Sequence, residues 1–522
     1  TETMEDFKLK PFKTDELRAF LQDLNFKTFE KNLLGNGQST FPVVIQSTDT
    51  SVAVQQKESV VITNSEIISS NTSSVYHVAI QPWDVDSLQK KIDQGDEFFA
   101  FVNSTQFVIC FGLDLYMTAI STCHLNFKNA IWSGFDLKNV WTQLGLKPVV
   151  PLKVQWDLML GSYILRAAES SNVEKLADFF LNKKIDFDAI ESENEKIKKY
   201  YEILLEINDV VKKDLVTKDL NVIYEKIEKP IISMLFDMES KGIKIDLVFL
   251  KSFSDELEVD IKTQEKLIYQ ITGAEFNIAS PKQLGVVLFE KMALESTKKT
   301  KTGYSTDNDV LEKLNHPIAK EIILYRELTK LKSTYVDALP GLADQQGRVH
   351  THFNQALTST GRLSSTNPNL QNIPIKTEKG QRVRKAFIAS EGKKLLSVDY
   401  SQIELRVLAH MSDDPGLISA FRDNLDIHTA TASEVFSVPL ENVTKEQRRI
   451  AKAVNFGIAY GQGVFGLAET LNIGRREASD IIERYFAKFG GIRDYIETTI
   501  KKAHEQKFVE TLFGRRRYIP EL

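Results

Sequence analysis

The chain has 522 residues, too many for one hydrophobic core, so about three or four domains are expected. Its composition, 42% hydrophobic and 26% charged, is that of an ordinary soluble globular protein, and no run of about 18 apolar residues predicts a membrane span. The net charge of −5 argues against a uniformly basic nucleic-acid binder, so any phosphate-binding charge must be local. Cys110 and Cys123 form no disulfide framework or zinc site and suit a reducing cytoplasm.

The first half of the chain predicts an α/β region followed by helices. A short helical pattern and a polar stretch fill residues 1–75, and residues 76–222 alternate strand and helix patterns. Residues 98–102 and 106–111 predict adjacent strands joined by a tight turn. Long helices are then predicted, and all of them lie between residues 223 and 340: 226–242, 246–272 and 311–339.

A basic loop, residues 296–306, separates two of these helices. Its lysines stand among small hydroxyl residues and a glycine, so backbone and ammonium groups could approach phosphates closely. A solvated basic loop is the other interpretation. The lysines concerned are Lys298, Lys299 and Lys301.

Strand patterns return at residues 349–353, 384–388 and 394–398. The last is an apolar run that ends at Asp399, which predicts a carboxylate at the carboxyl end of a buried strand, where oxygen ligands can hold a hard metal ion. Ser401 and Glu404 have capping-box spacing and predict a helix that begins there. The plainer alternatives make Asp399 a turn residue and Glu404 only a helix cap.

Residues 412–504 are almost wholly helical, and the best-defined helix begins at Thr444. Thr444 and Gln447 have the spacing of a capping box, while Gly457 and Gly461 mark where the helix should weaken or stop.

Every fourth residue of this helix forms one stripe of two cations followed by two aromatic rings, Arg448, Lys452, Phe456 and Tyr460. A nucleoside triphosphate has the matching polarity, with phosphates for the cations and a flat base for the rings. The alternative is an amphipathic helix with Phe456 and Tyr460 in the core.

Four segments of the chain together resemble the A-family DNA polymerases. DYSQIELR (399–406) is similar to motif A and RRIAKAVNFGIAYG (448–461) to motif B of that family. TSTGRLSSTNPNLQNIP (358–374) and ETLFGRRRYIP (510–520) match two further signatures. The four occur in the family's order, and the resemblance extends over essentially the whole chain, to the large fragment of the bacterial members.

The resemblance implies a multidomain α/β and α+β fold, with an RNase H-like exonuclease-type domain followed by a right-hand polymerase. The implied domains are a linker at 1–75, a degenerate 3′–5′ exonuclease-like domain at 76–222, a thumb at 223–340, the first part of the palm at 341–411, fingers at 412–504, and a returning palm segment at 505–522. A 5′-nuclease domain that precedes the linker in the family is absent from this sequence.

The implied activity is template-directed addition of deoxynucleotides to a primer 3′-hydroxyl, with release of pyrophosphate and with two Mg²⁺ ions. The resemblance makes Asp399 and the Tyr400 carbonyl metal ligands, and Lys452 a catalytic proton donor. It implies contacts with the deoxynucleoside triphosphate for Gln402, Glu404, His428, Arg448, Lys452, Phe456 and Tyr460. It implies contacts with primer-template DNA for Lys298, Lys299, Lys301, Arg362, Asn369, Gln371, Arg382, Arg384 and Arg515. A cytoplasmic, nucleoid-associated monomer without a membrane partner is expected.

The chain departs from the family at two carboxylate motifs. Val102-Asn103-Ser104 stands where the exonuclease has Asp-x-Glu, and Asn139-Val140 where a second carboxylate is expected. Nearby acidic residues, Asp136 and Asp157, cannot restore the cluster, so a domain without proofreading activity is predicted. The sequence also ends before motif C, which supplies a second metal-binding carboxylate, so the chain alone is expected to lack full activity.

Three other functions are weighed against a DNA polymerase. A single-subunit RNA polymerase should not carry Glu404 where it would block a ribose 2′-hydroxyl. A non-catalytic fragment that binds primer-template DNA fits the incomplete carboxylate sets, but Asp399, Arg448 and Lys452 argue against it. An active exonuclease would need the missing Asp-x-Glu.

Overall fold

The computed structural model describes residues 76–103, 105–147, 152–166, 171–295, 299–300, 303–375 and 377–522. Its contacts divide the chain between Thr72 and Ser73, and everything below concerns the second unit. The features predicted within residues 1–75 lie outside the described part, as do Lys298 and Lys301; only the backbone of Lys299 is described.

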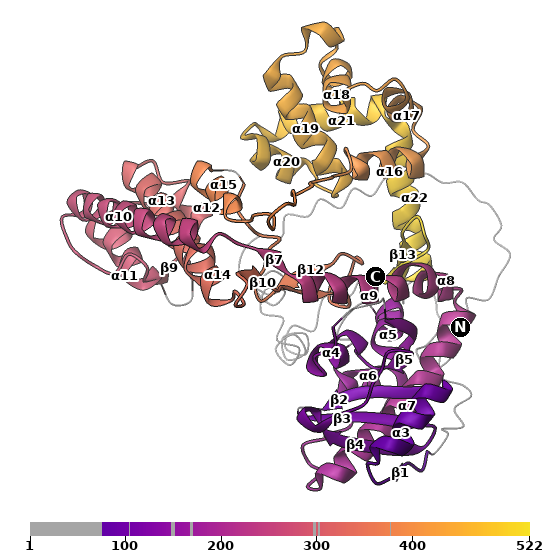
Figure 1. The fold of residues 1–522 in the computed structure, drawn as a ribbon. Coiled ribbons are helices and arrows are strands. Elements are labelled where there is room, and N and C mark those ends of the chain that lie inside the picture. Colours follow the sequence, from indigo (N-terminus) through magenta and orange to yellow (C-terminus); the bar gives the residue numbers. More distant parts are fainter. Residues whose placement is uncertain are drawn as a thin grey trace, which may run out of the picture. The chain divides into compact units, whose positions relative to one another are not determined.

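An α/β region follows, built on a six-stranded sheet of order β1-β4-β3-β2-β5-β6 (Figure 1). Strands β2, β3 and β4 are antiparallel neighbours, whereas β5 pairs in parallel with both β2 and β6. The predicted hairpin is confirmed, because Asn103 opposes Gln106 where β2 turns into β3. The strands are β1 (Ala79–Ile80), β2 (Phe98–Asn103), β3 (Gln106–Phe111), β4 (Asp114–Ala119), β5 (Ile131–Gly134) and β6 (Lys153–Asp157).

Helices cover this sheet because the alternating strand residues and one face of each helix are apolar. Trp132 and Trp141 are fully buried at the centre of the shared core. The helices are α3 (Val85–Gln94), α4 (Leu137–Gln143), α5 (Leu158–Arg166), α6 (Val173–Leu181), α7 (Glu193–Thr217) and the short α8 (Asn221–Ile223).

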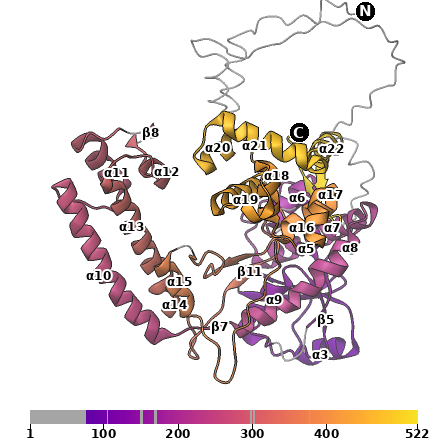
Figure 2. The same cartoon turned by 90° about the horizontal axis from the view of Figure 1, so that it is seen from above.

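The helices predicted at 226–242 and 246–272 are confirmed with small changes at their ends. The helix predicted at 311–339 begins later, at Pro317, because residues 312–316 are not helical. Asp246 caps α10 by accepting a hydrogen bond from the Phe249 N–H at 2.9 Å, and Gly273, with φ of 67°, ends it. Helices α10 and α13 pack side by side over apolar residues such as Leu257 and Leu328 (Figure 2). The elements are α9 (Lys229–Lys241), α10 (Leu247–Thr272), α11 (Pro281–Gly285), β8 (Lys299–Thr300), β9 (Gly303–Tyr304), α12 (Asn308–Leu311), α13 (Pro317–Leu331) and α14 (Ala338–Gly341).

The strand region expected at 349–398 differs from the prediction. The strands that form are short, and they pair in two separate two-stranded sheets, β10 with β7 and β11 with β12. The strand predicted at 384–388 is wrong, because Thr377 caps a helix, α15, that runs to Lys385 and buries Val383. The elements are β7 (Ile243–Lys244), β10 (Arg348–Val349), β11 (His352–Asn354), β12 (Ser364–Thr366) and α15 (Glu378–Lys385).

The buried strand predicted at 394–398 is also wrong. These residues form an exposed loop, in which Leu396 is 88% and Val398 82% exposed. A strand needs a neighbour for its backbone hydrogen bonds, and none pairs with this run in the described residues. Apolar composition alone therefore did not decide the structure here.

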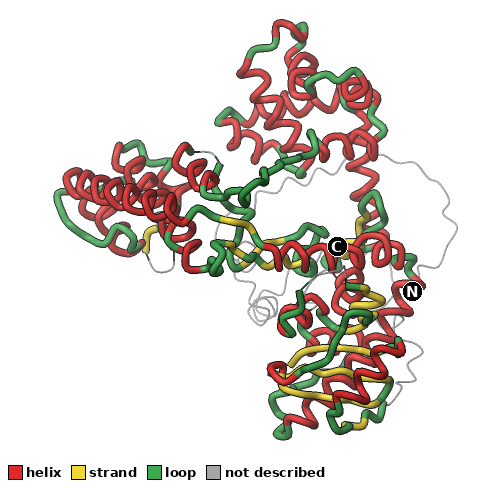
Figure 3. Tube along the Cα trace, viewed as in Figure 1, coloured by secondary structure: helices red, strands yellow, loops and turns green. Residues whose placement is uncertain are grey.

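The helical region predicted at 412–504 is confirmed: it consists of successive helices joined by loops, drawn red and green in Figure 3. Its core contains Leu417, Ile427, Val454, Leu467 and Tyr485. The elements are α16 (Ile403–Ser412), α17 (Pro415–Arg422), α18 (Ile427–Phe436), α19 (Lys445–Ala459), α20 (Val464–Leu471), α21 (Arg475–Lys488), α22 (Gly490–Gln506), β13 (Phe508–Glu510) and β14 (Arg516–Tyr518). Among the described helices, none is both long and apolar enough to cross a membrane.

Candidate functional site

The helix α19 has the start that the sequence predicts. The Gln447 N–H donates to Thr444 Oγ1 at 3.2 Å, and the Thr444 N–H donates to Gln447 Oε1 at 2.9 Å. This reciprocal pair satisfies two donors that would otherwise be orphaned in the first turn. The helix continues through buried Gly457 and ends at Ala459, before Gly461 with φ of 74°. The helix therefore does not stop at Gly457, whereas Gly461 marks its end.

The predicted stripe lies on the accessible side of α19. Arg448, Lys452 and Tyr460 are exposed, while Phe456 is half-buried. The opposite side carries the buried residues, including Val454 and Ile458. Because Tyr460 is 64% exposed, the alternative that places both rings in the core is wrong for Tyr460. Arg448, Lys452 and Tyr460 therefore lie outside the core, whereas Phe456 is partly within it.

Arg448 at the start of the stripe is paired with a carboxylate that sequence reasoning missed. Its Nε and Nη2 donate to the two oxygens of Asp426 at 2.7 and 3.0 Å. Asp426 also caps α18 and accepts two hydrogen bonds from Thr429. Partial burial opposes ionisation of Asp426, but the bonds from Arg448 and Thr429 outweigh it and lower the pKa to about 2. Arg448 is therefore held in place by a carboxylate that stays ionised at neutral pH.

His428 supports the stripe from α18. It is only 4% exposed, its Nδ1 lies 3.2 Å from the buried Asn455 Nδ2, and its ring centroid lies 5.7 Å from that of Phe456. Burial lowers the pKa of His428, and the nearby Arg448 and Lys452 charges add to this against the effect of Asp426. A neutral imidazole thus packs behind Phe456.

Glu404 joins two other predicted residues across the chain. The helix α16 begins at Ile403 after Gln402, which has φ of 52°, and no side chain caps it, so the capping role predicted from Ser401 and Glu404 is wrong. Glu404 instead accepts from Arg362 Nη2 at 2.5 Å and from the Tyr460 hydroxyl at 2.6 Å. The bond to Glu404 raises the pKa of Tyr460.

Asp399 lies in the exposed loop before α16 and not at the end of a strand. Its neighbour Tyr400 is 80% exposed. In the described ranges, no three side chains of His, Cys, Asp or Glu are grouped so that they could hold a metal ion. An exposed carboxylate and a backbone carbonyl are nevertheless oxygen donors of the kind that Mg²⁺ uses together with substrate phosphates.

Three of the DNA-contact candidates, Asn369, Gln371 and Arg384, line one groove of about 880 Å³. Its other side is formed by α13 and the helical segment that continues it, Lys332–Val336, including Lys330 and Tyr335. The exposed Asn369 Oδ1 accepts a hydrogen bond from the Gln371 N–H at 3.0 Å, which fixes the conformation of this segment. The structure thus brings these three residues together beside a helix that carries positive charge.

Two other candidates are engaged by carboxylates that sequence reasoning did not connect to them. Arg382 donates to both oxygens of Glu256 at 2.5 and 2.7 Å and lies 4.3 Å from the centroid of the Phe253 ring. Arg515 forms an ion pair with Glu228 in which both side chains are largely buried. Each partner lies more than a hundred residues away in the sequence, so no local pattern signals these pairs.

The acidic residues of the α/β region have structural partners. Asp136 caps α4, and Asp157 is buried and accepts from the Leu137 N–H at 2.8 Å. Burial, and then the charge of Asp136, raise the pKa of Asp157 to about 7. The Asn103 amide donates to Glu193 at 2.9 Å; Ser104 lies outside the described residues.

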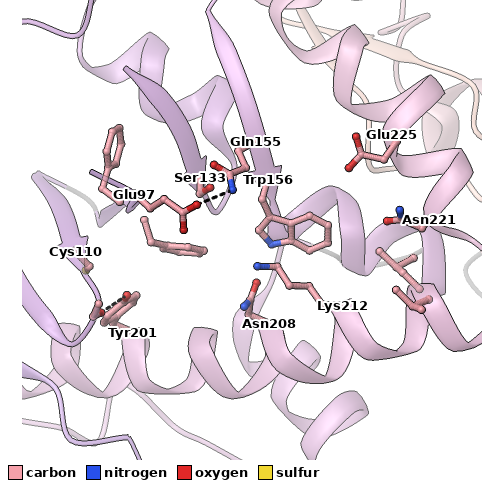
Figure 4. Close-up of a pocket in the computed structure, with 15 residues that line it drawn as sticks. Glu97, Cys110, Ser133, Gln155, Trp156, Tyr201, Asn208, Lys212, Asn221 and Glu225 are labelled. Atoms are coloured by element: carbon pink, nitrogen blue, oxygen red, sulfur yellow. Dashed lines mark hydrogen bonds between the residues drawn. The ribbon is translucent and has the colours of Figure 1, made fainter. Parts of the chain in front are cut away.

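A separate hollow of about 450 Å³ lies against the same sheet (Figure 4). Trp156 and Gln155 of β6 face Asn208 and Lys212 of α7 across it, and the Lys212 Nζ is 5.2 Å from the Trp156 ring centroid. None of the residues predicted for the site lines this hollow, so it is distinct from the stripe on α19.

Comparison with known proteins places these features in a family. Residues 248–522 match the model of DNA polymerase family A. The chain is 39% identical to DNA polymerase I of Caldicellulosiruptor bescii over 99% of its own length and 58% of that protein. It is 51% identical to DNA polymerase I of Bacillus subtilis over 59% of its length and 36% of that protein. The chain thus spans less than two thirds of the length of these relatives.

A solved structure is also similar. The POL domain of Pol1 from M. smegmatis, in complex with DNA primer-template and dNTP, matches 85% of the chain and 82% of its own with a TM-score of 0.74 and 34% sequence identity. The matched family model covers more than half of the chain, including α15, α16 and α19 with the residues described above. This chain therefore belongs to DNA polymerase family A.

Proposed function

We propose that the protein is a template-directed DNA polymerase that adds deoxynucleotides to a primer 3′-hydroxyl and releases pyrophosphate. The main support is that Glu404 accepts hydrogen bonds from both Arg362 and Tyr460. Tyr460 stands at the end of the stripe that also contains Lys452 and Phe456. Residues from three distant segments make one surface with cations at one end and rings at the other. The similar M. smegmatis domain, solved with primer-template and dNTP, supports this assignment.

The proposal includes the finer domain roles. The α/β region would be an exonuclease-like domain without proofreading, α10 and α13 the thumb, residues 341–411 the first part of the palm, and α16 to α22 mainly the fingers. Primer-template DNA would contact Arg362 and the groove formed by Asn369, Gln371 and Arg384, with the thumb-tip lysines further along the duplex. The protein would act in the cytoplasm as a monomer.

The chain's own side chains would each perform one part of the reaction. Lys452, which has no carboxylate within ion-pair distance among the described residues, would bind the triphosphate and donate a proton to the leaving pyrophosphate. The Arg448 guanidinium would donate hydrogen bonds both to Asp426 and to a phosphate oxygen. Phe456 and Tyr460 would contact the nucleotide, with His428 behind Phe456. Glu404, held by Arg362 and Tyr460, would occupy the space that a ribose 2′-hydroxyl needs.

Mg²⁺ fits the residues present, because Asp399 and the Tyr400 carbonyl offer oxygen ligands and the triphosphate would complete the set. Bound there, Mg²⁺ would neutralise phosphate charge and lower the pKa of the attacking hydroxyl. Asp399 would hold it from the loop before α16. Gln402, with its left-handed backbone, would turn the chain between Asp399 and Glu404.

The test is Asp399→Asn in the full-length protein. Primer extension should be lost, while affinity for primer-template changes by no more than about a few-fold, because phosphate contacts dominate DNA binding. Asp413→Asn is the matched control, since Asp413 is exposed, ends α16 and has a backbone conformation that Asn tolerates. Extension by Asp399→Asn at a rate near that of the control would remove Asp399 from the proposed role.

The second candidate is a factor that binds primer-template DNA without catalysis. The lack of a grouped carboxylate cluster in the described residues favours it. A wild-type protein that binds primer-template but extends no primer, with any divalent metal, would decide for this alternative.

A further inference from the structure

The loop that carries Arg362 is held by contacts from the α/β region. The hydroxyl of Tyr163, on α5, donates to the Thr358 carbonyl oxygen at 2.5 Å. Thr358 Oγ1 in turn donates to the Arg362 carbonyl oxygen at 2.7 Å. Residues 358–362 therefore form a closed loop that is anchored at its first residue by a side chain nearly two hundred positions earlier.

A buried ion pair also contacts the 358–362 loop. Arg515 pairs with Glu228, with 13% and 4% of their side chains exposed, and its guanidinium lies 5.5 Å from the Tyr163 ring centroid. Glu228 is fixed further because its backbone oxygen accepts from Gln355 Nε2 at 2.9 Å. Removing one partner of such a pair leaves a buried charge uncompensated, so the pair is stable only as a unit.

Gly361 shows how closely the loop rests on this support. Its φ is +83°, and a Cβ built there would lie 2.8 Å from Arg515 Nε and 3.2 Å from Arg515 Cδ. The loop therefore lies directly on the guanidinium that Glu228 and Tyr163 hold. The next residue, Arg362, sends its side chain to Glu404 at 2.5 Å, and Glu404 accepts from Tyr460.

We propose that Tyr163 of the α/β region and Glu228, which directly precedes α9, are positioning residues that fix the 358–362 loop and thereby the Arg362–Glu404–Tyr460 contact. This inference rests on the proposed function, because its consequence is the selection of deoxyribose over ribose by Glu404. It gives the α/β region a role in nucleotide selection that does not depend on any carboxylate cluster.

The experiment measures kcat/KM for a deoxynucleotide and the matching ribonucleotide in the full-length protein. Tyr163→Phe keeps the ring but removes the donor, and it should lower deoxy-over-ribo selectivity roughly 3- to 10-fold, as expected for one hydrogen bond. Glu404→Ala is the reference variant, in which the selectivity that depends on the Glu404 side chain is lost completely. The matched control is Tyr201→Phe, because this hydroxyl also donates to a backbone carbonyl, that of Gly112 at 2.9 Å, in the same α/β region. Its selectivity should equal that of the wild type.

A double-mutant cycle separates positioning from general destabilisation. If Tyr163 acts through the loop, Tyr163→Phe should have almost no further effect on selectivity in an Arg362→Ala protein. Thr358→Val, which removes the link inside the loop, should reproduce the Tyr163→Phe effect without a change in the α/β core. Melting temperatures of Tyr163→Phe and Tyr201→Phe provide the comparison for stability.

Two results would overturn this inference without affecting the proposed function. The first is wild-type selectivity in both Tyr163→Phe and Thr358→Val. The second is a loss of selectivity on Tyr163→Phe that is equally large in the wild-type and the Arg362→Ala backgrounds. A wild-type protein that extends no primer would overturn the proposed function and this inference with it.

Discussion

Phe456 lies half-buried, with its ring centroid 5.7 Å from the His428 ring and 6.4 Å from that of Tyr460. One side of the ring is thus supported while the rest faces the accessible surface of α19. A ligand could therefore contact the accessible part of the Phe456 ring while the rest of the ring stays packed. Glu404 is also held in place, because its two oxygens accept hydrogen bonds from Arg362 and Tyr460.

Phe456→Tyr tests whether that ring lies beside the incoming sugar. A dideoxynucleotide lacks the 3′-hydroxyl that a normal nucleotide brings, and the added tyrosine hydroxyl could make a hydrogen bond worth about 0.5–1.5 kcal/mol, or about 1.5–3 to a charged group. Dideoxynucleotide incorporation should therefore rise by about an order of magnitude, with little change for normal nucleotides. Single-nucleotide kinetics and a melting curve measure this; a lowered melting temperature with an unchanged ratio would place Phe456 in the core.

Asp157 gives a pH dependence at the residue scale. Burial and the charge of Asp136 raise its pKa to about 7, above the value of about 3.9 in an unfolded chain. A raised folded-state pKa means that its contribution to stability is full below about pH 4 and is lost as the pH rises to about 7. Stability of the α/β region should fall over that range.

Asp136→Asn should make this loss smaller, because it removes the like charge next to Asp157. Asn caps helices well and tolerates the φ of 54° at this position, so α4 should remain intact. Urea unfolding at pH 5 and pH 8 can be followed by fluorescence, since all four tryptophans lie in this region. Equal pH dependence in both proteins would show that Asp136 has no influence on Asp157. The reporting residues are Trp83, Trp132, Trp141 and Trp156.

At the scale of elements, α19 owes its position to both ends and to its buried face. Thr444 and Gln447 close the first turn, Gly461 ends the helix, and Val454 and Ile458 join the apolar core of the helical region. The stripe faces away from the core because the opposite face of α19 is packed into it. Strands behave differently: residues 394–398 have suitable side chains but no neighbouring strand in the described structure.

Thr444→Ala should destabilise the first turn of α19 by about 1 kcal/mol, the usual cost of removing an N-cap side chain. Amide hydrogen exchange within that turn should accelerate by about five-fold, whereas Thr444→Ser should exchange at nearly the wild-type rate because it keeps the hydroxyl. Unchanged protection in the alanine variant would mean that tertiary packing alone holds the helix start.

At the scale of the whole described molecule, an α/β region and a family A polymerase region share one chain. Their contacts include the bond from the Tyr163 hydroxyl to the Thr358 carbonyl oxygen, and the Arg515–Glu228 ion pair lies beside it. At Val102-Asn103-Ser104, where the sequence predicts that the exonuclease motif is lost, the Asn103 amide is bonded to Glu193.

The α/β region should accordingly show no proofreading. An end-labelled primer with a 3′ mispair, incubated with Mg²⁺ and without nucleotides, should keep its length, because the described residues of this region contain no grouped carboxylates that could hold two metal ions. Steady shortening that persists in Asp399→Asn would reveal an exonuclease site within this protein.

The sequence alone determined those features that depend on neighbouring residues. The capping box of α19, the end of α10 at Gly273, the hairpin of β2 and β3 and the family motifs were all predicted correctly, because each is set by local hydrogen bonding, backbone freedom or side-chain periodicity.

Only the tertiary structure decided the partners of the charged residues and the fate of the apolar run at 394–398. Asp426 for Arg448, Glu228 for Arg515, and Arg362 with Tyr460 for Glu404 are brought together by the fold from positions that no local pattern connects. The physical reason is that ion pairs and strand pairing depend on distances in space, whereas helix caps and turns depend on distances along the chain.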